Sequence, residues 1–168
     1  DSSTSRGLGD VYKRQIDAAE WIGPYDDEKL GFNKVARNYY FPGWWEGTLQ
    51  VSAYINADAY NKLPKHYQAA LSQASAAATN DMIAKYDAEN PAALRRLISQ
   101  GAQLKAFPKP VLDACYAEAN KLYAEMSAAS PEFKKIYDSM VAFRDNELPW
   151  FRVAEGSYDS YMGTTIKR

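Results

Sequence analysis

Helical periodicity dominates this chain, and the segments with strand periodicity are too few and too short to form a sheet of their own. Long stretches that follow Pro64, Pro110 and Pro131 repeat apolar residues every three or four positions, which is typical of amphipathic helices. Strand-like patterns are short and lie between these helices. The sequence therefore predicts a helix-rich α/β fold, of the kind expected for a piece of a larger α/β protein.

The first half of the chain is predicted to hold several short elements and one long one. The acidic residues 26–28 suit the start of a helix, and apolar spacing extends that helix to Ala36. Residues 49–55 alternate between apolar and polar side chains, which predicts a half-buried strand. Asn56 is the predicted N-cap of a short helix to residue 63, and a long helix begins after Pro64.

The second half is predicted to begin with a separate helix and to end in two long ones. Asn90 and Pro91 form an N-cap and first-turn proline, which predicts a new helix that ends at Gly101. A short strand is expected at 104–107, and helices are expected from 111 to 126 and from Ser130 onward. Pro149 is predicted to kink or interrupt the last helix. Its inward face is expected to comprise Phe133, Ile136, Tyr137, Met140 and Phe143.

Charge and rare residues exclude several classes of function. The formal net charge is −1, which gives no electrostatic case for binding nucleic acid. Cys115 is the single cysteine and His66 the single histidine, so a disulfide, a cysteine zinc site and a Ser-His-Asp triad are not expected. No apolar run reaches the roughly 20 residues that span a bilayer.

The densest candidate site pairs two acidic residues with aromatic side chains. Glu20 and Glu46 lie 26 residues apart and flank residues 39–45, of which five are aromatic. Carboxylate and carbonyl oxygens suit a hard cation, and aromatic walls suit a small-molecule pocket. Spacing alone still favours core aromatics and surface acids, while paired carboxylates also leave acid/base hydrolysis open.

Residues 1–15 do not resemble the rest of the chain. They are polar, and the segment DVYKRQ can be encoded by the mosaic-end sequence of a transposon adaptor. We therefore expect 1–15 to be a non-native, adaptor-like tail and the native N-terminus to be missing. The native part is then 16–168.

Three motifs in 16–168 resemble a known family. The segments AAEW, GPYDD and PGWWEG are similar to the solute-binding proteins of tripartite ATP-independent periplasmic (TRAP) transporters. The similarity is to the branch that binds 2-oxo acids and other monocarboxylates, and it covers essentially all of 16–168. It implies that the chain is the C-terminal portion of a two-domain, type II-like periplasmic binding protein. Such a protein is not an enzyme; it would deliver a small carboxylate to membrane permease subunits.

The resemblance also implies a binding site. A Ca²⁺ or Na⁺ ion would bridge protein and substrate carboxylate, held by the Glu20 carboxylate, the Trp21 main-chain carbonyl and Glu46. Trp44 or Trp45 would line the pocket, with Tyr25 at its rim. The family's substrate-anchoring arginine and a glutamine metal ligand lie upstream of the matched motifs, so we expect this chain not to form the complete site.

The resemblance leaves open what covers the C-terminal helices, and the residues leave open one rival function. Relatives often form homodimers through their C-terminal helices, and Met140, Phe143, Trp150 and Phe151 give an apolar surface compatible with that or with packing on a missing half. The rival is a helical interaction or oligomerisation module whose aromatic residues are only core. Metal-dependent binding of a carboxylate would separate the two functions.

Overall fold

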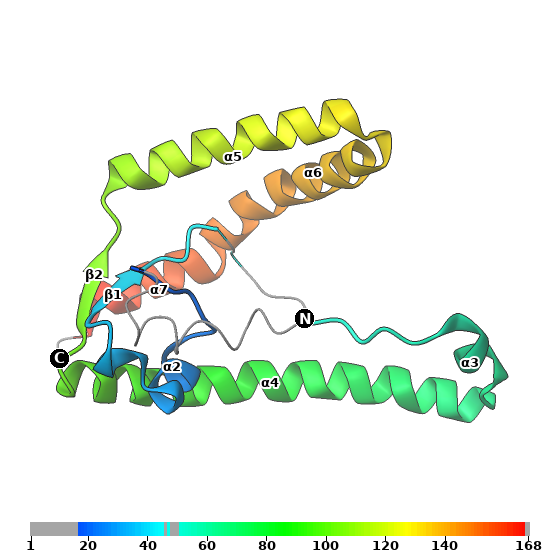
Figure 1. Cartoon of the computed structure of the whole chain (residues 1–168), viewed down its shortest axis with the longest axis horizontal. Coiled ribbons are helices and arrows are strands. Elements are labelled where there is room, and N and C mark those ends of the chain that lie inside the picture. The colour runs from blue at the N-terminus through cyan, green and yellow to red at the C-terminus, as the bar shows by residue number, and fades with distance from the viewer. Residues whose placement is uncertain (1–16, 46, 48–50, 167–168) are drawn as a thin grey trace. The chain divides into compact units, whose positions relative to one another are not determined.

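The computed structural model describes residues 17–45, 47 and 51–166 of the chain. These residues form two compact units, one ending at Pro108 and the other beginning at Lys109 (Figure 1). The predicted adaptor-like tail and Glu46 lie outside the described residues. Within the described part, no helix is both long and apolar enough to cross a membrane.

The first unit contains two strands, three α-helices and a short 3₁₀ helix. In chain order they are α2 (Pro24–Leu30), η1 (Phe32–Lys34), β1 (Asn38–Phe41), α3 (Ala57–Lys62), α4 (Lys65–Ser99) and β2 (Gln103–Ala106). The strands pair in parallel, with Asn38 opposite Gln103 and Phe41 opposite Ala106. The main-chain connection between them includes α3 and α4, as a parallel pair requires.

The helix predicted from residue 26 begins and ends earlier than its apolar spacing indicated. Pro24 occupies the first turn, and Asp26 and Asp27 follow within it. Gly31 then adopts a left-handed conformation (φ 74°), and its amide bonds the Glu28 carbonyl at 3.0 Å. The extension to Ala36 was therefore wrong, because a left-handed glycine ends an α-helix whatever the pattern beyond it.

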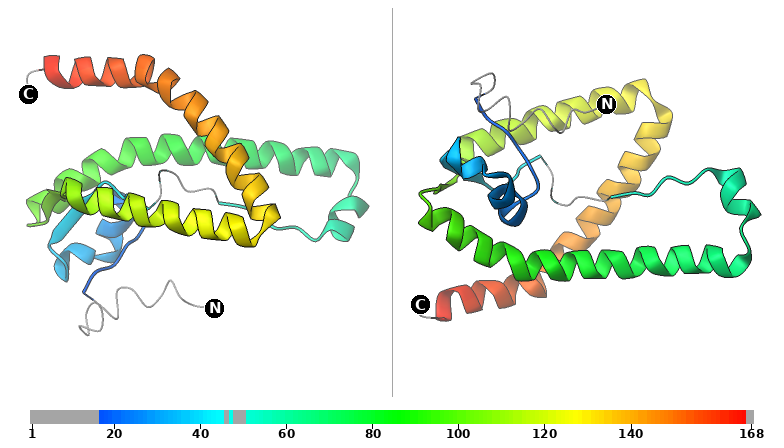
Figure 2. Two further views of the ribbon diagram at one scale, coloured as in Figure 1. Left: turned by 90° about the horizontal axis from the view of Figure 1, so that it is seen from above. Right: turned by 60° about the horizontal axis from the view of Figure 1, so that its bottom comes forward.

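The predicted helix boundary at Asn90 was also wrong. Helix α4 runs without a break from Lys65 to Ser99 and contains Pro91 in its interior. A proline there removes one main-chain donor and crowds the preceding turn, which bends a helix without necessarily ending it. The C-terminal part of α4 is correspondingly bent (Figure 2).

The predicted stop at Gly101 is confirmed, and it leads directly into β2. Gly101 has φ 99°, and its amide donates to the Ile98 carbonyl at 3.0 Å. The Ala102 amide donates to the Leu97 carbonyl, also at 3.0 Å. These two bonds form a Schellman motif, which turns the chain from the helix into the strand at Gln103.

One predicted strand is confirmed and one is wrong. The strand expected at 104–107 is β2, displaced by one residue. Residues 51–55 of the strand expected at 49–55 are irregular and exposed, and 49–50 lie outside the described part. The partner of β2 is instead β1, whose aromatic residues 39–41 do not alternate with polar ones and so gave no strand signal.

The buried apolar core of the first unit, among the described residues, lies on the C-terminal part of α4 and in the turn that follows it. Its members are Ala93, Leu97 and Ala102, whose exposed fractions are 9% or less. Helix α2 packs along this part of α4 (Figure 1). The predicted cap of α3 is confirmed here, since the Asn56 side chain accepts a hydrogen bond from the Ala59 amide at 3.0 Å.

The second unit consists of three helices, α5 (Lys109–Ala129), α6 (Pro131–Val153) and α7 (Glu155–Thr165). Helices α5 and α6 form an open hairpin whose arms converge at Ser130 (Figures 1 and 2). Ser130 caps α6, as predicted, by accepting a hydrogen bond from the Phe133 amide at 3.2 Å. Close to this turn, Tyr137 contacts the rings of Tyr123 and Phe133 at centroid distances of 5.1 and 5.8 Å.

The inward face predicted for α6 is only partly buried. Phe133 and Tyr137 are half-buried, whereas Ile136, Met140 and Phe143 are more than half exposed. Those three were wrongly assigned, because helical spacing marks an apolar face but not whether a partner covers it. Pro149 does not interrupt α6, which ends four residues later at Val153.

Candidate functional site

The segment that carries Glu20 and Trp21 leads into α2 without being helix or strand itself. Glu20 is exposed and Trp21 is half-buried. Three residues later, Pro24 fixes the first turn of α2 with its φ already close to helical. This segment therefore places the Glu20 side chain at the surface, just ahead of α2.

The two tryptophans lie just after β1 and contact one another. The rings of Trp44 and Trp45 meet edge-to-face with centroids 5.5 Å apart, and each residue is 44% exposed. Trp45 also meets Phe107, at 6.4 Å, just after β2. The parallel pairing of β1 and β2 thus gathers aromatic rings where both strands end. Glu46, the next residue, lies outside the described part of the chain.

A buried carboxylate links α2 to β1. Asp27 is 6% exposed, and the Tyr39 hydroxyl donates to its Oδ2 at 2.5 Å. Its Oδ1 is buried too and has no partner in hydrogen-bonding geometry among the described residues. Burial raises the pKa of Asp27, the Tyr39 hydrogen bond opposes that shift, and the negative charges of Asp26 and Glu20 add to it. Burial is the main cause that raises the pKa of the Tyr39 hydroxyl, and its hydrogen bond to Asp27 raises it further.

Replacing Tyr39 by phenylalanine is expected to destabilise the first unit by about 1–3 kcal/mol at pH 7, because it strips the buried carboxylate of its donor. An acid whose folded-state pKa is raised costs stability above its unfolded-state pKa. The loss should therefore shrink as the pH is lowered and Asp27 becomes protonated in the folded state.

Urea unfolding of Tyr39→Phe at pH 7 and pH 4 measures this effect. Tyr40→Phe is the matched control, because Tyr40 is 46% exposed and lies on the same strand. We expect it to change stability by less than about 0.5 kcal/mol. Equal losses for the two variants would contradict the role given to the Tyr39–Asp27 bond.

Tyr25 is placed against α4 by a set of contacts across the helix pair. Its ring meets the Tyr86 ring edge-to-face at 6.3 Å, and the Lys29 Nζ lies 3.7 Å above its centroid. The Tyr86 hydroxyl donates to Asp26 at 2.7 Å. These contacts account for Tyr25 within α2 and α4, so its place at a pocket rim stays a prediction.

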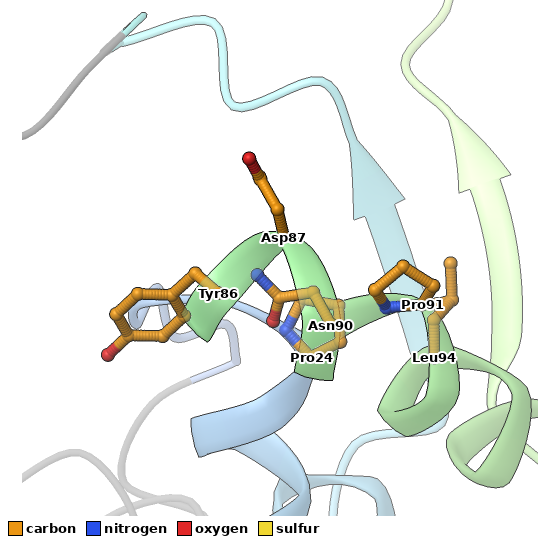
Figure 3. A pocket seen from close by; sticks show the side chains of 6 residues that line it. All are labelled: Pro24, Tyr86, Asp87, Asn90, Pro91 and Leu94. Carbon is orange, nitrogen blue, oxygen red and sulfur yellow. The ribbon is translucent and has the colours of Figure 1, made fainter. Parts of the chain in front are cut away.

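Two shallow hollows lie along the same helix pair. One, of about 320 Å³, is shown in Figure 3; it is lined by Pro24, Tyr86, Asp87, Asn90, Pro91 and Leu94. The other, of about 350 Å³, is lined by Tyr25, Asp26, Lys29, Asp81, Met82, Lys85 and Tyr86. Neither involves Glu20, Trp21 or the tryptophan pair. The described members of the candidate site, Glu20, Trp21, Trp44 and Trp45, therefore lie on two segments of the chain, and neither hollow encloses them.

A metal site made wholly of side chains is not found in the described part of the chain. No three His, Cys, Asp or Glu residues there are grouped closely enough to hold an ion. The predicted set needs only two acidic side chains and one main-chain carbonyl, and one of those acids is Glu46. Its oxygen donors suit Ca²⁺ or Na⁺, and the assignment of Glu20, Trp21 and Glu46 stays a prediction.

Sequence reasoning missed Asp27, Tyr39 and Asn90 as structural parts of this region. Asp27 was read only as an acid in a helix's first turn, where it does lie. Asn90 was read as the cap of its own helix, whereas its side chain bonds the Tyr25 amide of α2 at 3.0 Å. The Tyr39–Asp27 and Tyr25–Asn90 hydrogen bonds each join different helices or strands, and no local sequence pattern reveals such contacts.

Comparison with known proteins identifies one family. The model of the DctP family, the bacterial extracellular solute-binding proteins of family 7, matches residues 8–130. A monocarboxylate 2-oxoacid-binding periplasmic protein of Nostoc sp. PCC 7120 is 38% identical over 161 residues, covering 94% of this chain and 44% of that protein. The family match begins within the segment predicted to be adaptor-like.

Two solved structures resemble the chain closely. A TRAP transporter solute-binding protein of Bordetella bronchiseptica RB50, a mixed-occupancy dimer with calcium and picolinate in one site, has a TM-score of 0.89 and 50% identity. A TRAP periplasmic solute-binding protein of Pseudoalteromonas atlantica T6c, with bound sodium and pyruvate, has a TM-score of 0.82 and 29% sequence identity.

The likeness extends over most of this chain but only part of each relative. It covers 94% and 98% of this chain, and 48% and 49% of the two solved chains. The chain thus spans about half the length of the relatives it matches. The helix-rich α/β fold and its relation to the two-domain binding proteins are confirmed.

Proposed function

This chain belongs to the bacterial extracellular solute-binding proteins of family 7, and on that premise we propose that it is part of the solute-capturing subunit of a TRAP transporter. The subunit would act in the periplasm, bind a small carboxylate and carry it to membrane permease subunits. It would be a binding protein and not an enzyme. The observation that carries this proposal is the 50% identity and TM-score of 0.89 to a solute-binding protein of that transporter class.

The proposed ligand is a 2-oxo acid or a related monocarboxylate held through a metal ion. Similar proteins contain calcium with picolinate or sodium with pyruvate, and one is named for monocarboxylate 2-oxoacids. Because a hard cation attracts carboxylate oxygens from protein and ligand alike, one ion can hold both. The cation would then offset the negative charge of Glu20 and of the bound acid together.

Within this chain, the proposed metal ligands are the Glu20 carboxylate, the Trp21 carbonyl and the Glu46 carboxylate. Two observations support the part of this set that the structure describes: the Glu20 side chain is exposed, and Trp21 lies in the irregular segment ahead of α2. Trp44 and Trp45 would form an aromatic wall, supported by the contact between their two rings and by the contact of Trp45 with Phe107. An arginine and a glutamine from outside 16–168 would complete the site.

Calorimetric titration of pyruvate into the full-length gene product tests this proposal. We expect binding in the presence of Ca²⁺ or Na⁺ and a loss of binding after chelation of Ca²⁺ in Na⁺-free buffer, because the carboxylate then faces Glu20 without a cation between them. Metal-independent binding would contradict the bridging ion. Absence of binding to pyruvate, lactate and picolinate with either metal would favour the helical interaction module.

We also propose a homodimer through the C-terminal helices. The supporting observations are the dimer in the Bordetella structure and the exposed apolar side chains of α6. Met140, Phe143, Trp150 and Phe151 are each at least half exposed in this chain. Such a run of exposed apolar residues on one helix is typical of a surface that another protein segment covers.

A further inference from the structure

Helix α2 lacks a capping side chain of its own. Its N-cap residue is Gly23, which has no side chain to accept a hydrogen bond from the first-turn amides. Such amides normally bond an Asn, Asp, Ser or Thr side chain at the N-cap, and an unmet donor destabilises the helix start. The Tyr25 amide, in this first turn, instead donates to Asn90 Oδ1 of α4 at 3.0 Å.

Gly23 and Asn90 lie next to each other where α2 meets α4. A Cβ atom at Gly23 would lie 3.7 Å from Asn90 Oδ1, so the glycine lies directly beside the amide group that replaces its cap. Figure 3 shows Asn90 and Pro24 next to each other, with Asn90 on the turn of α4 that precedes Pro91. Asn90, which together with Pro91 resembles a helix start in the sequence, therefore accepts a hydrogen bond from the first turn of a different helix, α2.

We propose that Asn90 is a positioning residue for segment 20–23, which carries two of the proposed metal ligands, Glu20 and Trp21. The inference deepens the proposed function and rests on it. The Glu20–Trp21 pair is joined to α2 through only Ile22 and Gly23. Fixing the Tyr25 amide fixes the first turn of α2, which fixes the direction in which this segment leaves the helix. Removing the bond weakens the anchoring of the first turn of α2, so the direction of this segment is less well fixed before a metal ion binds.

The test is metal binding by Asn90→Ala in the full-length gene product, measured by Ca²⁺ titration with pyruvate present. We expect about a 10-fold weaker Ca²⁺ affinity, the lower end of the effect of losing a group that orients metal ligands. Hydrogen exchange of the Tyr25 amide should accelerate in the same variant. Asn90→Asp keeps an acceptor oxygen in place and should restore both properties to within about twofold.

A second variant separates positioning from loss of stability. Arg96 forms a two-pronged ion pair with Glu28 near the end of α2 that is farther from Glu20, with its Nη2 2.7 Å from Oε2. Arg96→Ala also weakens α2 against α4, but it leaves the Tyr25 cap intact. It should therefore leave the Ca²⁺ affinity and Tyr25 exchange close to wild type.

The outcomes distinguish this inference from the proposed function. If the wild-type protein binds Ca²⁺ and pyruvate but Asn90→Ala binds them equally well, Asn90 has no positioning role. If Asn90→Ala and Arg96→Ala weaken binding alike, or Asn90→Asp fails to restore it, the effect is one of general stability and the inference is overturned. If the wild-type protein binds neither ligand, the proposed function itself fails, while accelerated Tyr25 exchange still reports the cap.

Discussion

Replacing Glu20 by glutamine should abolish metal-dependent carboxylate binding at millimolar pyruvate. The side chain keeps its size and one neutral carbonyl oxygen, but it loses the negative charge and the second oxygen with which a carboxylate attracts a hard cation. A group that merely orients a metal ligand is worth about 10–100-fold in affinity, so a lost charged ligand should exceed about 100-fold. Titration of pyruvate with saturating Ca²⁺ in the full-length protein measures the effect.

Glu125→Gln is the matched control for this charge change. Glu125 is an exposed glutamate on α5, in the other compact unit. It should leave both the pyruvate affinity and the Ca²⁺ dependence at wild-type values. A Glu20→Gln protein that is folded by circular dichroism and binds pyruvate as the control does would show that Glu20 is no metal ligand.

Leu97→Ala should cause the largest loss of stability of any single truncation in the first unit. Leu97 is 2% exposed, and the fully buried apolar residues beside it are only Ala93 and Ala102 among those described. Truncating a buried leucine removes its apolar contacts and leaves a cavity, which costs about 2–5 kcal/mol. The loss should unfold the region that carries both α2 and the exit into β2.

Leu71→Ala on the same helix provides the comparison. Leu71 is 39% exposed, and alanine favours helix slightly more than leucine, so the change should be within about 0.5 kcal/mol. Urea unfolding followed by circular dichroism, with hydrogen exchange across α2 and α4, measures both variants. A Leu97→Ala protein as stable as Leu71→Ala would mean that α2 and α4 are not held together by this core.

Local chemistry made several boundaries readable from the sequence. Asn56 and Ser130 cap their helices in the expected way, and Gly101 ends α4 in the expected left-handed conformation. These are interactions between residues at most five positions apart, so a local pattern contains all of the partners. The family was recognisable for a similar reason, since its motifs around Glu20 and Trp44 are short and contiguous.

The failures share the opposite cause. Asn90–Pro91 has the pattern of a helix start, but tertiary packing kept α4 continuous and directed the Asn90 side chain to α2. The strand at 38–41 depends on pairing with residues more than 60 positions away. The burial expected for Ile136, Met140 and Phe143 required a covering surface, and helical spacing cannot tell whether one is present.

The helix-rich character, the helix ends with local caps and the family motif around Glu20 could thus be predicted from the sequence, because each depends on neighbouring residues. Tertiary contacts were needed to bury Asp27 against Tyr39, to bring Asn90 to the N-terminus of α2, and to bring Trp45 against Phe107 where the paired strands end. Those contacts join distant segments, and their free energy comes from burial and hydrogen bonds that exist only once the chain has folded.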